Sequence, residues 1–254
     1  MITQQVFVWS LLALCVVVLA VFLKEDLPEY RHFKTLTETA DRQRQFRKWI
    51  VKSAWMFGGT AIPGLVLLRH LGALTFAGMP VEFAPMVRLL PAIHLGEHFG
   101  GFLIGVGLGV VGAGIVIAVA FRLFRKKKQP AKLYTLGDIA PLLPRNNAER
   151  VWALLISLNA GWCEELFFRL FLPLLITLAT GNAVIGFGAA VIVFGLVHFY
   201  QGFSGILATT VLGALLTAIY LVTGNIWIAA GVHALVDING LIVQPLLLGR
   251  RDVQ

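Results

Sequence analysis

The sequence carries little charge for its length. Charged residues make up 13% of the 254 residues, hydrophobic residues make up 58%, and the mean hydropathy is +0.82. This composition argues against a soluble domain with one large core. It predicts an all-α, polytopic transmembrane helical bundle, with room for about seven spans of roughly 20 residues each.

Cysteines are rare, and there is no sign of a cleavable leader or of an internal repeat. Cys15 and Cys163 both fall in apolar runs, which argues against a disulfide framework and favours small packing residues.

The first apolar run lacks a basic segment before it and a small-residue cleavage site after it, so we expect no removable signal peptide. Without a repeat, nothing indicates the inverted halves of many transporters.

Basic residues are concentrated in two hydrophilic segments. Of the 21 Lys and Arg residues, 16 lie in residues 24–52 and 122–150. This clustering is typical of cytoplasmic loops and of attraction to anionic lipid, and it does not indicate a nucleic-acid partner. The first segment also contains regularly spaced apolar residues. It suits either an amphipathic helix lying at the membrane interface or a solvated loop.

Seven apolar segments are long enough to be spans. We expect them at Val6–Leu23, Ser53–Leu68 with a kink at Pro63, Gly101–Leu123, Asn147 to a break at Thr180–Asn182, Ala183–Tyr200, Gly205–Val222 and Ile226–Leu248. The loops then carry eight, two and eight basic residues in alternation. This pattern predicts an outside N-terminus and an inside C-terminus.

Two motifs outside the later spans give weaker signals. His94 and His98 are four residues apart, but they do not form the zinc signature His-Glu-x-x-His, so we interpret residues 69–98 as a polar outer loop. The run from Gly107 to Gly112 matches the letters of the dinucleotide fingerprint. No strand–helix–strand unit surrounds it, and glycines at four-residue spacing favour close helix packing instead.

Ionisable side chains are scarce in the last hundred residues. Between Val151 and Gly249, the charged residues and histidines are Glu164, Glu165, Arg169, His198, His233 and Asp237. A charged side chain at the centre of a bilayer costs about 2.5–3.5 kcal/mol on insertion scales. Groups that are retained at this cost are expected to have either partners or a function.

Helical spacing divides these groups into pairs. Residues four apart share a helix face, so Glu165 should pair with Arg169, and Glu164 should point elsewhere, free for acid–base chemistry. His233 and Asp237 have the same spacing, as do Phe194 and His198. Three polar stripes facing one cavity could activate water, relay protons or bind a metal, for example zinc at Glu164, His198 and His233.

Three motifs in order resemble a known family. Glu164-Glu165-x-x-x-Arg169, Phe194-x-x-x-His198 and His233-x-x-x-Asp237 resemble the motifs of the CPBP family of intramembrane glutamic endopeptidases. This family includes CAAX prenyl proteases of type II and proteins linked to bacteriocin immunity. The resemblance divides the chain into an N-terminal membrane region, 1–139, and a CPBP-like catalytic core, 140–254.

The resemblance implies roles for the polar residues. Glu164 and His233 would polarise water for attack on a peptide bond near the cytoplasmic side, Glu165 and Arg169 would hold the geometry with Phe194 as a wall, and no metal or other cofactor would be needed. His198 and Asp237 would form the oxyanion site. An ionised Asp237 cannot donate a hydrogen bond, so its alternative role is to orient His233.

The substrate implied by the resemblance is a peptide or membrane protein within the lipid bilayer, and the expected location is a bacterial inner membrane. Two other functions stay open at this point. One is a non-proteolytic immunity or scaffolding protein with the same fold, and the other is a proton-coupled carrier.

Overall fold

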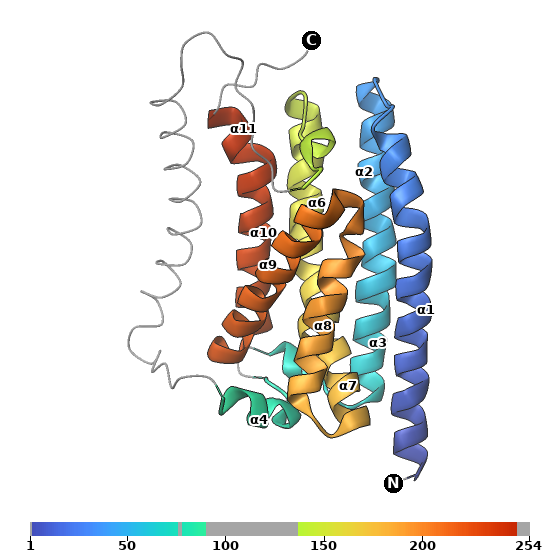
Figure 1. The fold of residues 1–254 in the computed structure, drawn as a ribbon, viewed down its shortest axis with the longest axis vertical. Helices are drawn as coiled ribbons and strands as arrows, with labels where there is room; N and C mark the ends of the chain where they lie inside the picture. The colour runs from blue at the N-terminus through green and yellow to red at the C-terminus, as the bar shows by residue number, and fades with distance from the viewer. Residues whose placement is uncertain (1, 76–77, 90–136, 248–254) are drawn as a thin grey trace.

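A computed structural model describes residues 2–75, 78–89 and 137–247 of the chain, and these residues form helices and turns without a strand (Figure 1). The predicted all-α fold is confirmed. The predicted span Gly101–Leu123, the glycine motif inside it and the pair His94–His98 lie outside the described residues, as do residues 122–136 of the second basic segment.

The N-terminal region is a long helical hairpin. Helix α1 runs over Ile2–Phe33, and α2 (Thr39–Ser53) continues through a π-helical segment, η1 (Ala54–Gly58), into α3 (Gly59–Leu67). The alternative of a solvated loop at 24–52 is therefore wrong, because most of these residues extend the two helices. A position of this segment at the membrane interface stays a prediction. Pro63 lies inside α3, just after the π-helical segment.

Buried ion pairs explain why the charged segment is helical. The side chains of Arg42 in α2 and Glu149 are fully buried, with Nε and Oε2 3.0 Å apart. The Arg42 guanidinium also donates to the carbonyl oxygens of Pro141 and Leu143, at 3.0 and 3.3 Å. These contacts fasten the connection before the next helix onto α2, and breaking such a buried pair typically costs about 3–5 kcal/mol.

The central helix carries the two adjacent glutamates. It consists of α6 (Asn147–Glu165), a π-helical segment η5 (Leu166–Phe171) and α7 (Leu172–Thr180). Its start is fixed by Asn146, whose side chain accepts a hydrogen bond from the Glu149 amide at 3.0 Å, as expected of an N-cap. Its end is fixed by Gly181, which adopts a φ of 72°. The predicted start and interruption are both confirmed.

Among the described residues, three further helical segments follow. Helix α8 spans Ala183–Val197, α9 spans Gly202–Thr223, and α10 (Ile226–Ile238) continues through a π-helical segment, η7 (Asn239–Val243), into α11 (Gln244–Leu247). The turn between α8 and α9 contains the 3-10 segment η6 (Phe199–Gln201). Figure 1 shows that this turn lies well below the upper end reached by α2 and α6.

Short elements connect the long helices. These are η2 (Leu71–Leu74), η3 (Val81–Phe83), α4 (Ala84–Val87) and η4 (Ala140–Leu142). The first three lie at the lower end in Figure 1, where the Trp227 indole N–H donates to the Leu74 carbonyl at 2.8 Å. Residues 137–142 lie close to the α8–α9 turn, because the Asp138 amide donates to the Gln201 carbonyl at 2.8 Å.

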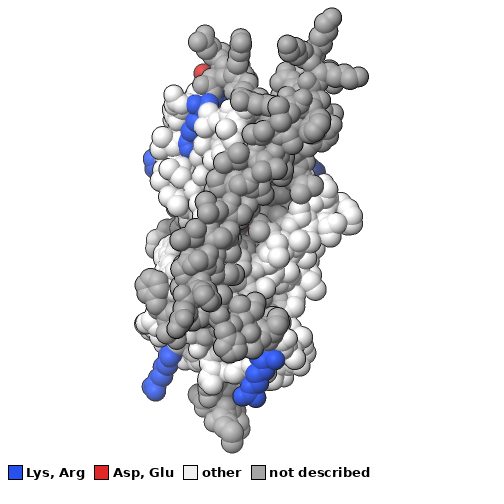
Figure 2. Space-filling model, turned by 90° about the vertical axis from the view of Figure 1, so that its left-hand side faces the viewer, with Lys and Arg blue, Asp and Glu red and all other residues white. Residues whose placement is uncertain are grey.

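The distribution of side chains suits a membrane. Among the described residues, four helices are long and apolar enough to cross a bilayer by length and composition: Gln5–Phe33, Thr39–Leu67, Phe199–Thr223 and Ile226–Leu247. Many of their large apolar side chains point outward, whereas Glu165, Arg169 and His233 are buried. On the face drawn in Figure 2, the described Lys and Arg side chains lie near the two ends of the molecule. This inside-out pattern is that of an integral membrane protein.

Candidate active site

The two adjacent glutamates at the end of α6 point in different directions. Glu165 is fully buried, and its carboxylate contacts Arg169 in η5 and His233 in α10. Its Oε2 lies 3.1 Å from Arg169 Nε, so the predicted pair four residues apart is present. Glu164 faces an interior cavity instead, and its Oε2 is buried without a hydrogen-bond partner among the described residues.

Arg169 contacts the Glu165 carboxylate and the aromatic ring of Phe194. Its guanidinium carbon lies 3.8 Å from the centre of the Phe194 ring, which is cation–π geometry. Phe194 thus does more than form a wall of the cavity: its ring supports the cation that neutralises Glu165. Since only 1% of the Arg169 side chain is exposed, water does not compete for this arrangement.

His233 is oriented by Glu165. Its Nδ1 lies 2.8 Å from Glu165 Oε1, and because a carboxylate paired with an arginine only accepts hydrogen bonds, Nδ1 carries the proton. Nε2 faces Asp237, whose Oδ2 is 3.8 Å away. The shorter contact therefore comes from another helix, 68 residues away in sequence. The orienting role of Asp237 stays a prediction.

His198 lies in the turn after α8. Its Nδ1 lies 2.8 Å from the carbonyl oxygen of Phe194. Since that oxygen can only accept, Nδ1 donates, and Nε2 of the neutral ring keeps its lone pair. Nε2 lies 3.9 Å from Glu164 Oε2. Of the two imidazoles, His198 is the one whose ring nitrogen forms an ion-pair contact with Glu164.

One cavity of about 390 Å³ collects the predicted residues. Its walls include Glu164, His198, His233 and Asp237, together with Phe194. Residues 139 and 142, from the connection before α6, also contribute, as does the η7 region after Asp237. Three separate helical segments therefore bring the Glu164 carboxylate and two imidazoles to the same cavity. Whether these residues are catalytic stays a prediction.

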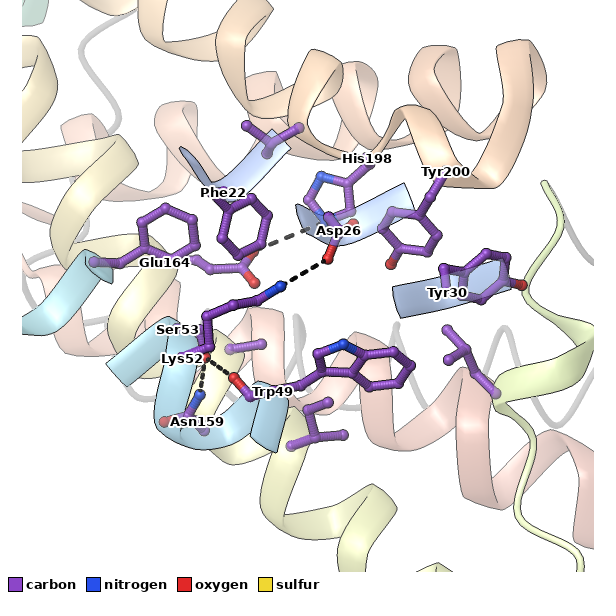
Figure 3. A pocket seen from close by; sticks show the side chains of 15 residues that line it. Phe22, Asp26, Tyr30, Trp49, Lys52, Ser53, Asn159, Glu164, His198 and Tyr200 are labelled. Atoms are coloured by element: carbon purple, nitrogen blue, oxygen red, sulfur yellow. Dashed lines mark hydrogen bonds and ion pairs between the residues drawn. The ribbon is translucent and has the colours of Figure 1, made fainter. Parts of the chain in front are cut away.

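A second, smaller cavity of about 100 Å³ adjoins the first at Glu164, His198 and Tyr200 (Figure 3). Its other polar wall residues are Asp26, Tyr30, Trp49, Lys52, Ser53 and Asn159. Sequence reasoning missed these groups, because most come from α1 and α2 and no short motif links them to Glu164. The only available signal was the occurrence of Asp26 and Lys52 next to apolar runs.

The arrangement of the ionisable groups bears on metal binding. Within the described part of the chain, no three His, Cys, Asp or Glu side chains are grouped closely enough to hold a metal ion. In each imidazole Nδ1 is bound, by Glu165 at His233 and by a carbonyl at His198, and a metal-ligating histidine commonly has such a partner on its second nitrogen. Chemistry without a metal stays a prediction for this site.

Together the fold and the cavities define an integral membrane protein with an acid–imidazole centre between its helices. Residues 146–239, which contain every one of these acids and imidazoles, match the sequence model of the family described as type II CAAX prenyl endopeptidase Rce1-like. The match confirms the family resemblance for this segment and supports a general role as a CAAX-type intramembrane protease. No curated protein and no solved structure matches the chain.

Proposed function

We propose that this protein is an intramembrane endopeptidase that hydrolyses a peptide bond with a water molecule held between Glu164 and His198. The observation that supports this most strongly is that Glu164 Oε2, which has no hydrogen-bond partner among the described residues, lies 3.9 Å from His198 Nε2 in a shared cavity. Both atoms are acceptors. A water molecule that donates one proton to each keeps its own lone pair free to attack a carbonyl carbon.

The chemical steps need only groups that line the cavity. As the water oxygen bonds to the carbonyl carbon, Glu164 takes a water proton and the carbonyl oxygen becomes an oxyanion. When the carbon–nitrogen bond breaks, Glu164 returns that proton to the leaving amine, so the carboxylate is regenerated. A general base of this kind typically contributes 10²–10⁴-fold to the rate.

We assign the second imidazole to the oxyanion. His233 holds its Nδ1 proton against Glu165, so in the imidazolium form its Nε2–H can donate into the cavity. The family resemblance implied the opposite assignment, with His233 at the water and His198 at the oxyanion. The pairing of Glu164 with His198 and of His233 with Asp237 supports the exchanged roles.

The substrate class follows from the site's surroundings. The cavity lies between apolar helices, so the scissile bond should belong to a peptide segment that lies in or at the bilayer. The family's name points to prenylated C-terminal CAAX peptides, and for this chain we propose a peptide or membrane protein as substrate, without a requirement for prenylation. The expected setting is the inner membrane of a bacterium, with the site facing the cytoplasm.

Comparison of two variants tests the proposal. Membranes from cells producing the wild type, Glu164→Gln or the control Glu25→Gln would be profiled for new peptide termini. Glu25 is exposed on α1, so its substitution makes the same change of charge away from the cavity. We expect termini that depend on the wild type and on Glu25→Gln and that fall at least about 100-fold in Glu164→Gln.

The other outcomes identify the alternatives. If Glu164→Gln inserts normally and yields the same termini as the wild type, the hydrolytic role of Glu164 is wrong. If the wild type yields no termini but protects cells or binds partners equally well with Glu164→Gln, a non-proteolytic immunity or scaffolding role is the better reading. Metal analysis of active protein, with chelator treatment, tests the metal-independent chemistry: stoichiometric metal lost together with activity would contradict it.

A further inference from the structure

Asp26 is a buried acid that the proposed reaction does not use. It lies in α1, is 7% exposed, and lines the smaller cavity next to Glu164 (Figure 3). Its Oδ1 is 3.6 Å from Lys52 Nζ, and its Oδ2 has no hydrogen-bond partner among the described residues. Burying a carboxylate costs folding free energy unless a hydrogen-bond donor or a cation contacts each of its oxygens.

Lys52 does not satisfy the second oxygen of Asp26, because its ammonium lies closer to another acid, Glu29. Glu29 Oε2 lies 2.7 Å from Lys52 Nζ and accepts a second hydrogen bond, also at 2.7 Å, from the Trp49 indole. Glu29 Oε1 pairs with Lys48 at 3.1 Å. Both carboxylate oxygens of Glu29 thus have close partners. Asp26 has only the longer contact of 3.6 Å with the same lysine ammonium.

The walls of the smaller cavity favour a positive charge. Its charged wall residues are Asp26, Glu164 and Lys52, so with both carboxylates ionised the negative charges exceed the positive by one. Aromatic rings make up much of the remainder, from Phe22, Tyr30, Trp49, Phe57 and Tyr200. An acid among aromatic faces is the environment that binds ammonium and guanidinium groups, through charge and through the ring quadrupoles.

We propose that this cavity is a subsite for a basic side chain, Lys or Arg, of the peptide substrate. The inference rests on the proposed endopeptidase function, since the subsite meets the reacting groups at Glu164 and His198. A side chain bound at Asp26 would place the neighbouring peptide bond beside Glu164. Because Asp26 and Lys52 lie outside the family match of 146–239, this preference would belong to the chain's own N-terminal helices.

A binding measurement tests the subsite without using cleavage. Purified full-length protein in detergent would be unfolded thermally with n-butylguanidinium, which mimics an arginine side chain, or with its uncharged counterpart n-butylurea. We expect n-butylguanidinium to raise the unfolding midpoint of the wild type and of Glu25→Gln, and n-butylurea to leave it unchanged. In Asp26→Asn the apparent affinity should fall at least about tenfold.

A second variant protects the test against a folding defect. Lys52→Gln removes the competing cation, so n-butylguanidinium should bind it more tightly than the wild type. If Asp26→Asn fails to fold, this variant decides the question. Equal binding of the charged and uncharged probes, or weaker binding in Lys52→Gln, would overturn the proposal.

Cleavage sites supply an independent readout. Termini that depend on the wild type should have Lys or Arg within about three positions of the cut, and Asp26→Asn should lose this enrichment. Binding of n-butylguanidinium without any cleavage would contradict the proposed peptidase function, but it would still support the cation-binding site at Asp26. Cleavage without a basic preference and without guanidinium binding would contradict the subsite alone.

Discussion

At the scale of single residues, the pairs within one helix were predictable and the pairs between helices were not. The contact of Glu165 with Arg169 follows from their spacing of four residues on one helix. The hydrogen bond from His233 to Glu165 joins residues that are 68 positions apart, and no local rule indicates it. For the same reason, the sequence suggested Asp237, the neighbour on His233's own helix, as the orienting group.

Substitution of Arg169 should destabilise the protein strongly. In Arg169→Met, Glu165 stays buried without its cation, and the loss in unfolding free energy should be about 3–5 kcal/mol. Arg169→Lys keeps the charge but loses the planar stacking on Phe194, so its loss should be smaller. Unfolding of the purified variants in detergent measures both.

Arg88→Met is the control, since Arg88 is exposed at the end of α4. Its unfolding free energy should stay within about 0.5 kcal/mol of the wild-type value. An Arg169→Met variant as stable as Arg88→Met would show that the buried pair contributes nothing to folding.

At the scale of helices, capping residues made several boundaries predictable. Asparagine side chains cap α6, α8 and α10, and Gly181 and Gly224 end the helices before two of them with positive φ. For the charged segment 24–52, the sequence did not decide between a helix and a loop. Its helices depend on ion pairs such as Arg42 with Glu149, more than a hundred residues apart, which a local pattern of charge cannot distinguish from a solvated loop.

The contact between α6 and α10 sets the distance between the glutamates and His233. A Cβ added at Gly161 would lie 2.6 Å from the Ala230 carbonyl oxygen and 3.0 Å from the Ala234 backbone nitrogen. Gly161→Ala should therefore push the two helices apart beside Glu164 and Glu165. We expect peptidase activity to fall at least about tenfold, because reacting groups tolerate little displacement.

Gly188→Ala is the matched control on α8, where an added Cβ meets nothing within 4 Å. That variant should keep its activity and gain up to about 1 kcal/mol of stability, since alanine is the better helix former. Equal activity of the two variants would show that the close approach at Gly161 does not position the site.

At the scale of the whole molecule, composition predicted the helical membrane fold, and the order of motifs predicted the family whose model matches residues 146–239. The orientation in the membrane stays a prediction from loop charges. The smaller cavity was beyond prediction, because it forms only where the N-terminal hairpin packs against the segment that carries the motifs. Composition contains no information about that packing.

Cysteine labelling can test the orientation against a low background. Cys15 and Cys163 are both buried, so an impermeant maleimide should not label the wild type. Thr37→Cys, in the turn between α1 and α2, and Val81→Cys, in η3, place one thiol near each end of the molecule. In right-side-out bacterial membrane vesicles, we expect labelling of Val81→Cys at once and of Thr37→Cys only after permeabilisation. The reverse pattern would invert the predicted topology.

The π-helical segments η1, η5 and η7 have a consequence for comparing this chain with its relatives. A residue inserted into a regular α-helix turns everything after it by about 100°, unless one wide turn absorbs the addition. Each of these segments is such a turn, and η5 directly follows Glu165. A related sequence that is one residue shorter at one of these turns can keep the same helix faces on both sides. An alignment gap inside a helix is therefore structurally sound at these three places, whereas in the regular stretches between them it would misplace the buried side chains.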